Sequence, residues 1–245
     1  MKDKTIVHGL WVGENKLKNI ELLTLKSFVD MGAEFHLWNY GDVNQAVPDG
    51  VILCDAEQIL GSDKIFKRPE KMYFEFGGGN YVSFSDVFRY KVLYDLGGWW
   101  SDLDVVCLKP LEEVEGDYWF RFHGVLPAVG NIMKCPQGSE LMRLCYEKTL
   151  KEVNSGQCDM YYAVFIMCFY IELLDLKQYI TYNECNMDNW DTVVSLILEK
   201  EKDPPIPDSW RFIHWMNSVT PKKCVGESFM SNTLKKYNLF EKSFL

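Results

Sequence analysis

The sequence lacks a segment that could cross a membrane. Its longest uncharged apolar run, residues 160–171, is shorter than the ~20 residues that a bilayer-spanning helix needs. Residues 1–11 show none of the charged and then apolar organisation of a secretion signal. We therefore expect a cytoplasmic protein without a transmembrane segment, for which peripheral contact with a membrane surface stays open.

The sequence also lacks linkers, repeats and low-complexity stretches. No Pro-, Gly- or Ser-rich segment divides the 245 residues, and 47% of them are hydrophobic. A chain of this length and composition can bury one substantial core. We expect a single domain over residues 1–245.

Zinc-binding spacing is absent too. The eight cysteines form no C-x-x-C pair and no Cys/His pattern that would hold zinc. Since a chain with a good core does not need disulfides, free buried thiols in a reducing compartment are expected.

Positive charge is in short supply. The 26 Lys and Arg residues are outnumbered by 35 Asp and Glu residues, which gives a formal net charge of −9. Nucleic-acid binding needs a basic surface, so DNA and RNA are disfavoured as partners and we expect none. A phosphate ligand approaching this acidic chain would need a metal ion as a bridge.

The most informative segment that is present is residues 84–110. It places Asp102 and Asp104 at the end of an apolar stretch that we predict as a strand over 99–108. Residues two apart on a strand share a face, so both carboxylates are expected to point the same way. Carboxylate oxygens suit Mg²⁺ or Mn²⁺, whose other positions are filled by water and substrate phosphates.

A helix is predicted directly before these carboxylates, over residues 84–96, and it ends at Gly97 and Gly98. Asp86 and Arg89 lie one turn apart on it and can share a face. From the residues alone, a capping acid with a local ion pair and a ligand-binding pair are both open.

The pattern S-D-x-x-R-Y-x-x-L-Y-x-x-G-G-x-W-x-D-x-D over residues 85–104 resembles the sugar-binding DxD region of retaining glycosyltransferases. The similar proteins form glycosyltransferase family 32 and its relatives, which include yeast α-1,6-mannosyltransferases, animal α-1,4-galactosyltransferases and the large clostridial glucosylating toxins. The spacing from Asp86 to Asp104 matches without gaps. The family usually has Tyr where this chain has Trp100, which keeps an aromatic ring but removes a hydroxyl.

The resemblance implies roles in binding a nucleotide-sugar donor. Asp86 and Arg89 would bind sugar hydroxyls and the nucleotide side of the donor, and Trp100 would wall the sugar. Trp11, at the end of the opening strand TIVHGLW, would stack on the base, whereas the residues alone favour a core aromatic. Asn131 would approach the transferred sugar.

The carboxy-terminal segment 212–223, FIHWMNSVTPKK, is similar to the family's last motif. The resemblance implies that His214 reaches the metal, with Asn217 and Ser218 as substitutes, and that Lys222 reaches a phosphate. By residue type alone, a packed core histidine and a solvated surface lysine are the alternatives.

The order of predicted elements indicates an α/β fold, and the resemblance implies the GT-A nucleotide-sugar-binding fold, a Rossmann-like mixed sheet flanked by helices. The helix predicted at 159–174 lacks the Gly-Pro turn that opens a later helix in many family members. The predicted strands are 5–11, 34–40, 51–54, 99–108 and 118–125, and the predicted helices are 19–31, 56–60, 84–96, 139–153, 159–174 and 190–201.

We expect a metal-dependent retaining glycosyltransferase of glycan biosynthesis. It would move a hexose from a UDP-sugar such as UDP-glucose or UDP-galactose to a hydroxyl of a glycan, protein or lipid-linked acceptor, with GDP-mannose as the alternative donor. Asp102 and Asp104 would hold Mn²⁺ or Mg²⁺. Front-face attack assisted by the leaving phosphate is implied, and no catalytic base is expected.

Two other functions stay open. The stretch DLDVV, residues 102–106, also fits the DxDx[TV] motif of haloacid-dehalogenase-type phosphatases, with Asp102 as nucleophile and Asp104 as acid/base. That motif normally follows the first strand of its domain, which counts against this alternative. The other possibility is a non-catalytic nucleotide-sugar-binding protein.

Overall fold

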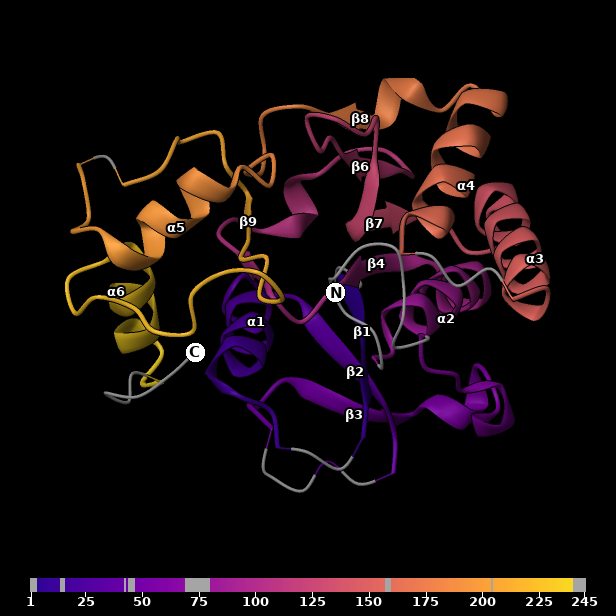
Figure 1. The fold of residues 1–245 in the computed structure, drawn as a ribbon, viewed down its shortest axis with the longest axis horizontal. Coiled ribbons are helices and arrows are strands. Elements are labelled where there is room, and N and C mark those ends of the chain that lie inside the picture. Colours follow the sequence, from indigo (N-terminus) through magenta and orange to yellow (C-terminus); the bar gives the residue numbers. More distant parts are fainter. Residues whose placement is uncertain are drawn as a thin grey trace.

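A computed structural model describes residues 4–13, 16–41, 43, 47–68, 80–156, 160–203 and 205–239. Strands and helices alternate along the first half, and helices predominate in the second (Figure 1). The strands are β1 (Ile6–Val12), β2 (Glu34–Tyr40), β3 (Val51–Asp55), β4 (Gly98–Ser101), β5 (Val105–Cys107), β6 (Trp119–Arg121), β7 (Val129–Cys135), β8 (Ile180–Thr181) and β9 (Phe212–His214). The helices are α1 (Asn19–Asp30), α2 (Val82–Leu96), α3 (Glu140–Asn154), α4 (Met160–Leu173), α5 (Trp190–Leu198) and α6 (Phe229–Lys236), and four short 3-10 turns are η1 (Ala56–Gln58), η2 (Ser62–Lys64), η3 (Leu111–Glu113) and η4 (Lys177–Tyr179).

Seven strands form one mixed sheet in the order β3-β2-β1-β4-β7-β6-β8. The first four strands in that order run parallel, β7 is antiparallel to both β4 and β6, and β8 runs parallel to β6. β5 and β9 form a separate antiparallel ribbon. In such α/β sheets ligands bind beyond the carboxyl ends of the parallel strands, and the two aspartates predicted as metal ligands directly follow β4.

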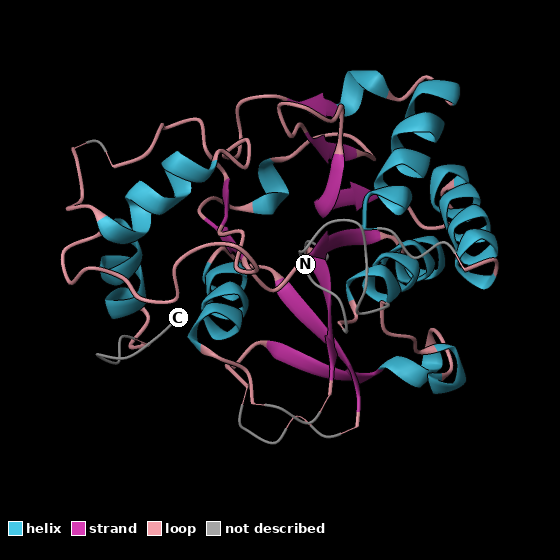
Figure 2. Cartoon of the chain, in the orientation of Figure 1, coloured by secondary structure: helices cyan, strands magenta, loops and turns pink. Residues whose placement is uncertain are grey.

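The two faces of the sheet carry separate hydrophobic cores. Consecutive residues of β4 alternate between them, because Trp100 packs with α2, α3 and α4, while Trp99 packs with α1 and the β5-β9 ribbon. Figure 2 shows α2, α3 and α4 gathered on one side of the strands and α1 on the other. Both tryptophans are almost completely buried, which anchors the strand that leads into the candidate site.

A third core joins the end of the chain to its middle. Side chains of α1, β5, α5, β9 and α6 meet there around Trp215. The α5 helix is capped by Asn189, whose side chain accepts the backbone N–H of Thr192, and α6 is capped in the same way by Ser228, which accepts the N–H of Ser231. This cluster holds the carboxy-terminal segment beside β5.

The structure confirms the α/β class and most predicted elements, and it corrects two of the predicted strands. The strand predicted over 99–108 is interrupted, because residues 102–104 form a turn between β4 and β5. Asp102 and Asp104 therefore do not share one strand face. The strand predicted over 118–125 shortens to β6, where the pairing register shifts between Phe120 and Arg121.

The strand β7 and the elements β9 and α6 were not among the predicted elements. β7 has no alternating pattern because almost its whole length is buried, and its Gly130 and Asn131 disfavour a strand on propensity. β9 has only three residues and depends on pairing with β5.

Candidate functional site

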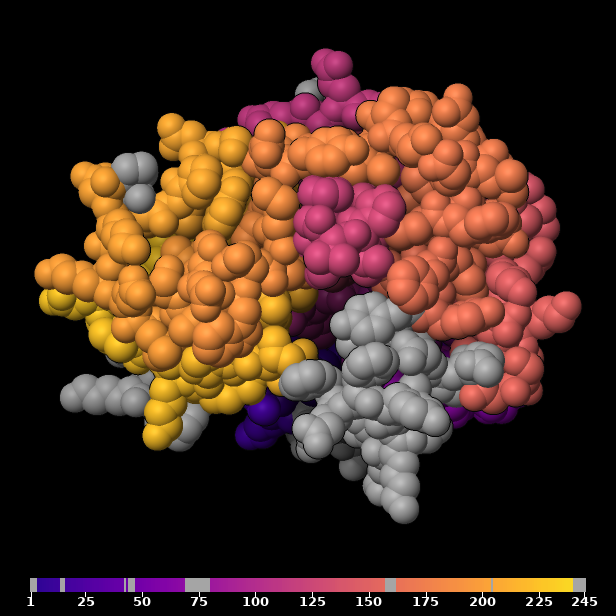
Figure 3. Space-filling model, turned by 45° about the horizontal axis from the view of Figure 1, so that its top comes forward, coloured from indigo at the N-terminus to yellow at the C-terminus, as the bar shows by residue number. Residues whose placement is uncertain are grey.

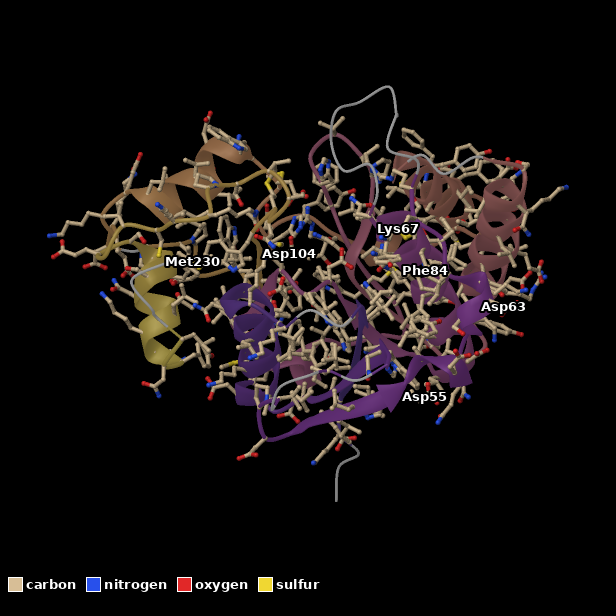
Figure 4. The ribbon with its side chains drawn as sticks, turned by 60° about the horizontal axis from the view of Figure 1, so that its bottom comes forward. Asp55, Asp63, Lys67, Phe84, Asp104 and Met230 are labelled. Carbon is tan, nitrogen blue, oxygen red and sulfur yellow. The ribbon has the colours of Figure 1, made fainter. Side chains whose placement is uncertain are left out.

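The backbone of the turn at residues 102–104 pairs with a different strand at each end. The N–H of Asp102 donates to the carbonyl of Asn131 at 2.8 Å, which extends the pairing of β4 with β7. The carbonyl of Asp104 accepts the N–H of Trp215 at 2.9 Å, which begins the pairing of β5 with β9. Figure 4 shows Asp104 near the middle of the molecule, between α6 and α2.

Asp102 is held from the side of α2. Its Oδ1 accepts hydrogen bonds from Nε1 of Trp100 at 2.7 Å and from Nη2 of Arg89 at 2.9 Å. The other end of the same guanidinium, Nη1, lies 2.9 Å from Oδ1 of Asp86. The Asp86 and Arg89 side chains are each 5% exposed, whereas that of Asp102 is 31% exposed. Of the three charged groups, Asp102 is the one open to a ligand.

Burial dominates the electrostatics on this side. It raises the pKa of Asp86 to about 6 against the opposing effect of Arg89, and it raises the pKa of Asp102 in the same way. One guanidinium thus serves two carboxylates in a poorly solvated environment. Asp86 acts in this arrangement mainly as the second counter-ion of Arg89.

Asp104 is held from the other side, by β9 and the turn after it. Its Oδ2 accepts the N–H of Asn217 at 2.9 Å and lies 3.5 Å from Nε2 of His214. Met216, with a φ of 53°, makes the turn that aims this N–H at the carboxylate. Burial raises the pKa of Asp104, but His214 and Asn217 together hold it below its ordinary value.

His214 is itself oriented by a buried carboxylate. Its Nδ1 lies 2.7 Å from Oδ1 of Asp188, whose Oδ2 lies 2.5 Å from Nη2 of Arg121 and 3.4 Å from Nε2 of His123. Burial alone would raise the pKa of Asp188 and lower that of His214. The charges together have the larger effect: His214 and Arg121 depress the pKa of Asp188, and Asp188 and Asp104 raise the pKa of His214 to about 10. The ring nitrogen that faces Asp104 is therefore fixed by Asp188 from behind.

Sequence reasoning missed Asp188, Arg121 and His123. The chain has only four histidines, and that scarcity was a signal that could have drawn attention to His123. No local pattern marks Asp188 or Arg121, because they come together only when β6, β9 and the segment before α5 pack.

The two tryptophans that were predicted to contact the donor, Trp11 and Trp100, lie in different environments. Trp11 lies at the carboxyl end of β1 and is half-buried against the core that contains Trp99. Trp100 is 1% exposed and its ring packs against Phe88, so the ring lies in the core behind Asp102, and its contact with a sugar stays a prediction. Its contribution to the site is the N–H that it donates to Asp102.

Asn131 has an unsatisfied side chain. It lies on β7 beside Asp102 and is 8% exposed, and neither its Nδ2 nor its Oδ1 has a hydrogen-bond partner among the residues described. Leaving a buried carboxamide unpaired costs stability, so such groups usually mark a place where a ligand or water binds.

The last predicted residues lie around Asp104. Lys222 donates to Oδ1 of Asn217 at 2.8 Å, and burial and the nearby Lys18 lower its pKa while Asp104 opposes this. Ser218 is exposed beside them. The segment after β9 therefore places the Lys222 ammonium close to Asp104.

The donor set fits a hard divalent cation. In the part of the chain that the structure describes, no three His, Cys, Asp or Glu side chains form a ready metal cluster. Each aspartate nevertheless keeps one oxygen, Oδ2 of Asp102 and Oδ1 of Asp104, without a hydrogen-bond partner among those residues. Mg²⁺ and similar ions commonly bind through one or two carboxylates plus substrate phosphates, so a third protein ligand is not required.

Residues 36–121 match the family model described as "Glycosyltransferase sugar-binding region containing DXD motif". The matched span is less than half of the chain, and it contains Asp86, Arg89, Asp102 and Asp104. No protein of curated function matches the sequence.

Solved glycosyltransferase structures are similar to this fold. "PaToxG Glycosyltransferase" aligns with a TM-score of 0.53 and 12% identity over 71% of this chain and 72% of its own. The galactosyltransferase LgtC, solved with donor and acceptor sugar analogues, gives 0.49 and 9% over 94% of each chain. GlyE of Streptococcus pneumoniae TIGR4 gives 0.46 and 11% over 98% of this chain and 61% of its own. The first alignment identifies the architecture as the expected GT-A type.

The helices give no candidate for a membrane span. None in the described part of the chain combines the length and hydrophobicity that crossing a bilayer requires.

Proposed function

We propose that this protein is a metal-dependent retaining glycosyltransferase. Its sequence matches the DXD sugar-binding region of glycosyltransferases, and its fold is of the GT-A type. One observation carries the proposal. Asp102 and Asp104 follow β4 at the carboxyl end of the parallel strands, and each is held through one oxygen while the other oxygen stays available. This arrangement suits a cation that bridges the protein to a diphosphate.

The donor side of the proposed site is formed by residues of β1, α2 and β7. Arg89 keeps Asp102 in place, and the unpaired carboxamide of Asn131 offers a donor and an acceptor to sugar hydroxyls. Trp11, at the end of β1, is proposed to contact the base, and Lys222 a phosphate.

Asp102 and Asp104 would hold Mn²⁺ or Mg²⁺, and His214 would join them through Nε2 once that nitrogen has lost its proton. The ion would neutralise the charge that develops on the departing diphosphate. Asp188 accepts from Nδ1 of His214 and so keeps Nε2 directed at Asp104. Asn217 donates its N–H to Asp104 and maintains the orientation of that carboxylate.

The finer assignment follows from the resemblance. We propose a hexose donor of the UDP-sugar type, with GDP-mannose as the alternative, and transfer to a hydroxyl on a glycan. Retention is proposed to proceed by front-face attack, in which the leaving phosphate assists the acceptor hydroxyl, and no residue is assigned as a base.

The test is release of nucleoside diphosphate from a panel of UDP- and GDP-sugars, with Mn²⁺ and with a chelator. Metal-dependent release from one donor is expected. Asp102→Asn and Asp104→Asn keep the shape and one acceptor oxygen but remove the charge and the second oxygen, so each should lower the rate at least about 100-fold. Asp117→Asn, in the exposed turn before β6, is the matched control and should retain full activity.

Full activity in either variant would remove the metal role. Metal-dependent donor binding without release would indicate the non-catalytic protein instead, and a phospho-aspartyl intermediate at Asp102 would indicate the phosphatase.

A further inference from the structure

We propose that a pocket next to His214 binds a neutral saccharide and is a subsite for the glycan acceptor. This inference rests on the proposed function. The pocket lies between the segment joining β8 to α5, the start of α5 and the turn before β9. It encloses about 460 Å³, within the range of small-molecule sites. We call it the amide pocket, and its lining is Tyr182, Asn183, Cys185, Asn186, Met187, Asn189, Thr192, Pro207, Ser209 and Trp210.

The lining carries no ionisable acid or base of the Asp, Glu, Lys, Arg or His type. This is notable because a quarter of the whole sequence is charged. Three carboxamides and three hydroxyls, those of Thr192, Ser209 and Tyr182, supply both donors and acceptors instead. Such groups match the hydroxyl edges of a sugar ring, which need both kinds of partner.

Two aromatic side chains complete the match. Tyr182 and Trp210 both line the pocket, and the C–H faces of a pyranose ring are the apolar surface that packs against aromatic rings. Tyr182 is 54% exposed and is supported from behind by Phe122, with ring centroids 4.8 Å apart. The aromatic wall therefore exists before any ligand binds, which limits the cost of ordering it.

Some of the polar lining is free to bind. The Asn183 side chain is exposed and has no hydrogen-bond partner within the described ranges. Asn189 uses its Oδ1 to cap α5 at Thr192, and its Nδ2 has no partner within the same ranges. These carboxamide atoms are the proposed contacts for sugar hydroxyls.

The amide pocket adjoins the candidate site through Asn186. This buried residue lines the pocket, and its carboxamide accepts the N–H of His214 at 2.8 Å and donates to the carbonyl of His214 at 2.9 Å. The wall of the pocket thus continues into the residue that faces Asp104. In Figure 3 the surface is hollowed between the magenta atoms near residue 125 and the orange and yellow atoms of the C-terminal half.

Other ligand classes fit less well. A nucleotide could stack on the same rings, but no Lys or Arg lines the pocket to neutralise its phosphates. A lipid chain would leave the carboxamides unpaired. A neutral saccharide satisfies both kinds of surface.

The test measures binding of neutral disaccharides of glucose, galactose, mannose and N-acetylglucosamine to the full chain by saturation-transfer NMR. Saturable binding of at least one disaccharide is expected. Tyr182→Ala and Asn183→Ala should each weaken it about tenfold. The controls are Phe169→Ala, which removes an exposed ring of α4, and Asn154→Ala, at the end of α3; neither should change binding.

Donor release without acceptor separates this inference from the proposed function. Tyr182→Ala should leave the rate of donor release unchanged while raising the KM for the disaccharide in transfer. If donor release is present but no disaccharide binds below 10 mM, or the pocket variants bind as wild type, the inference is overturned and the transferase stands. Displacement of the disaccharide by UDP would also overturn it. Disaccharide binding lost in Tyr182→Ala, with no donor release, would keep the pocket and reject the transferase.

Discussion

At the scale of single residues, Arg89 is a buried cation that neutralises two carboxylates of the candidate site. Its guanidinium contacts Asp86 and Asp102 and is almost wholly buried. Removing one partner of a buried ion pair leaves uncompensated charge in a medium that solvates it poorly. Arg89 is therefore a stabilising residue as well as a proposed donor-binding one.

Arg89→Ala should lower the free energy of unfolding by about 3–5 kcal/mol, because two buried carboxylates lose their common counter-ion. Chemical denaturation measures this directly. The matched control is Arg143→Ala on α3, whose guanidinium also contacts two carboxylates, those of Glu140 and Glu147, but is 37% exposed. Solvent screens exposed pairs, so Arg143→Ala should change the stability only slightly. Equal losses in the two variants would show that burial of Arg89 is unimportant.

His8 is a second residue whose burial has a measurable consequence. It lies on β1 and accepts the indole N–H of Trp38 on Nδ1 at 3.1 Å, so the Nε2 proton is directed at the carbonyl of Gly97, 3.1 Å away. Burial, with a smaller contribution from His36, lowers the pKa of His8 to about 4. The ring is neutral when the protein is folded at neutral pH.

Stability should fall as the pH decreases from 6.5 to 4, since His8 binds a proton in the unfolded chain but not in the folded one. The loss attributable to this residue is about 3 kcal/mol, and it is complete below the folded pKa. The free energy of unfolding, compared at pH 7, 5 and 4 for wild type and His8→Gln, isolates this contribution from the carboxylates. Curves that stay parallel over that interval would contradict it.

At the scale of elements, the site depends on how closely β7 approaches α2. Gly130 on β7 faces the guanidinium of Arg89 so closely that a Cβ there would lie 2.3 Å from Nη1. A contact that short forces the guanidinium to move. The absence of a side chain at this position is what lets Arg89 reach Asp102.

Gly130→Ala should therefore weaken donor binding about tenfold and lower stability by about 1–3 kcal/mol, because the Arg89 guanidinium is displaced. Calorimetric titration of the donor and thermal unfolding measure the two effects. Gly226→Ala is the control, since a Cβ there meets nothing within 4 Å. Wild-type donor affinity in Gly130→Ala would mean that the position of Arg89 is not critical.

Elements with strong apolar patterning could be predicted from the sequence, and elements that depend on pairing could not. The parallel strands β1, β2 and β3 and the helices α1 and α2 follow their expected ranges closely. The β5-β9 ribbon has three residues per strand and forms only because α1, α5 and α6 pack around it.

The same distinction applies to the candidate site. The motif from Asp86 to Asp104 could be found in the sequence because all its residues lie in one continuous segment of the chain. Asp188 reaches His214 across 26 residues, and only the folded chain brings the two together.

At the scale of the whole molecule, the chain is acidic, and the Asp102 and Asp104 side chains of its candidate site are 31% and 20% exposed. A net charge of −9 disfavours a free diphosphate, and Asp102 and Asp104 lie where the diphosphate is proposed to bind. Nucleotide and cation should therefore bind together, each raising the affinity for the other.

Mn²⁺ and UDP together, each far above its dissociation constant, should raise the melting temperature by roughly 5–10 °C, because ligands that bind only the folded state stabilise it. Either ligand alone should give a small shift. Differential scanning fluorimetry with and without a chelator measures this. Asp104→Asn should abolish the joint effect; an equal shift with UDP alone would show that no cation bridge is needed.

The division of the turn at residues 102–104 between two structural neighbourhoods gives each carboxylate its own spectroscopic reporter. The indole N–H of Trp100 donates a hydrogen bond to Asp102, and the imidazole of His214 faces Asp104. In an NMR spectrum these are two well-separated classes of signal, one from an indole proton and one from a ring carbon-bound proton. Arrival of a ligand at either carboxylate can therefore be followed independently, in the unmodified protein and without an activity assay.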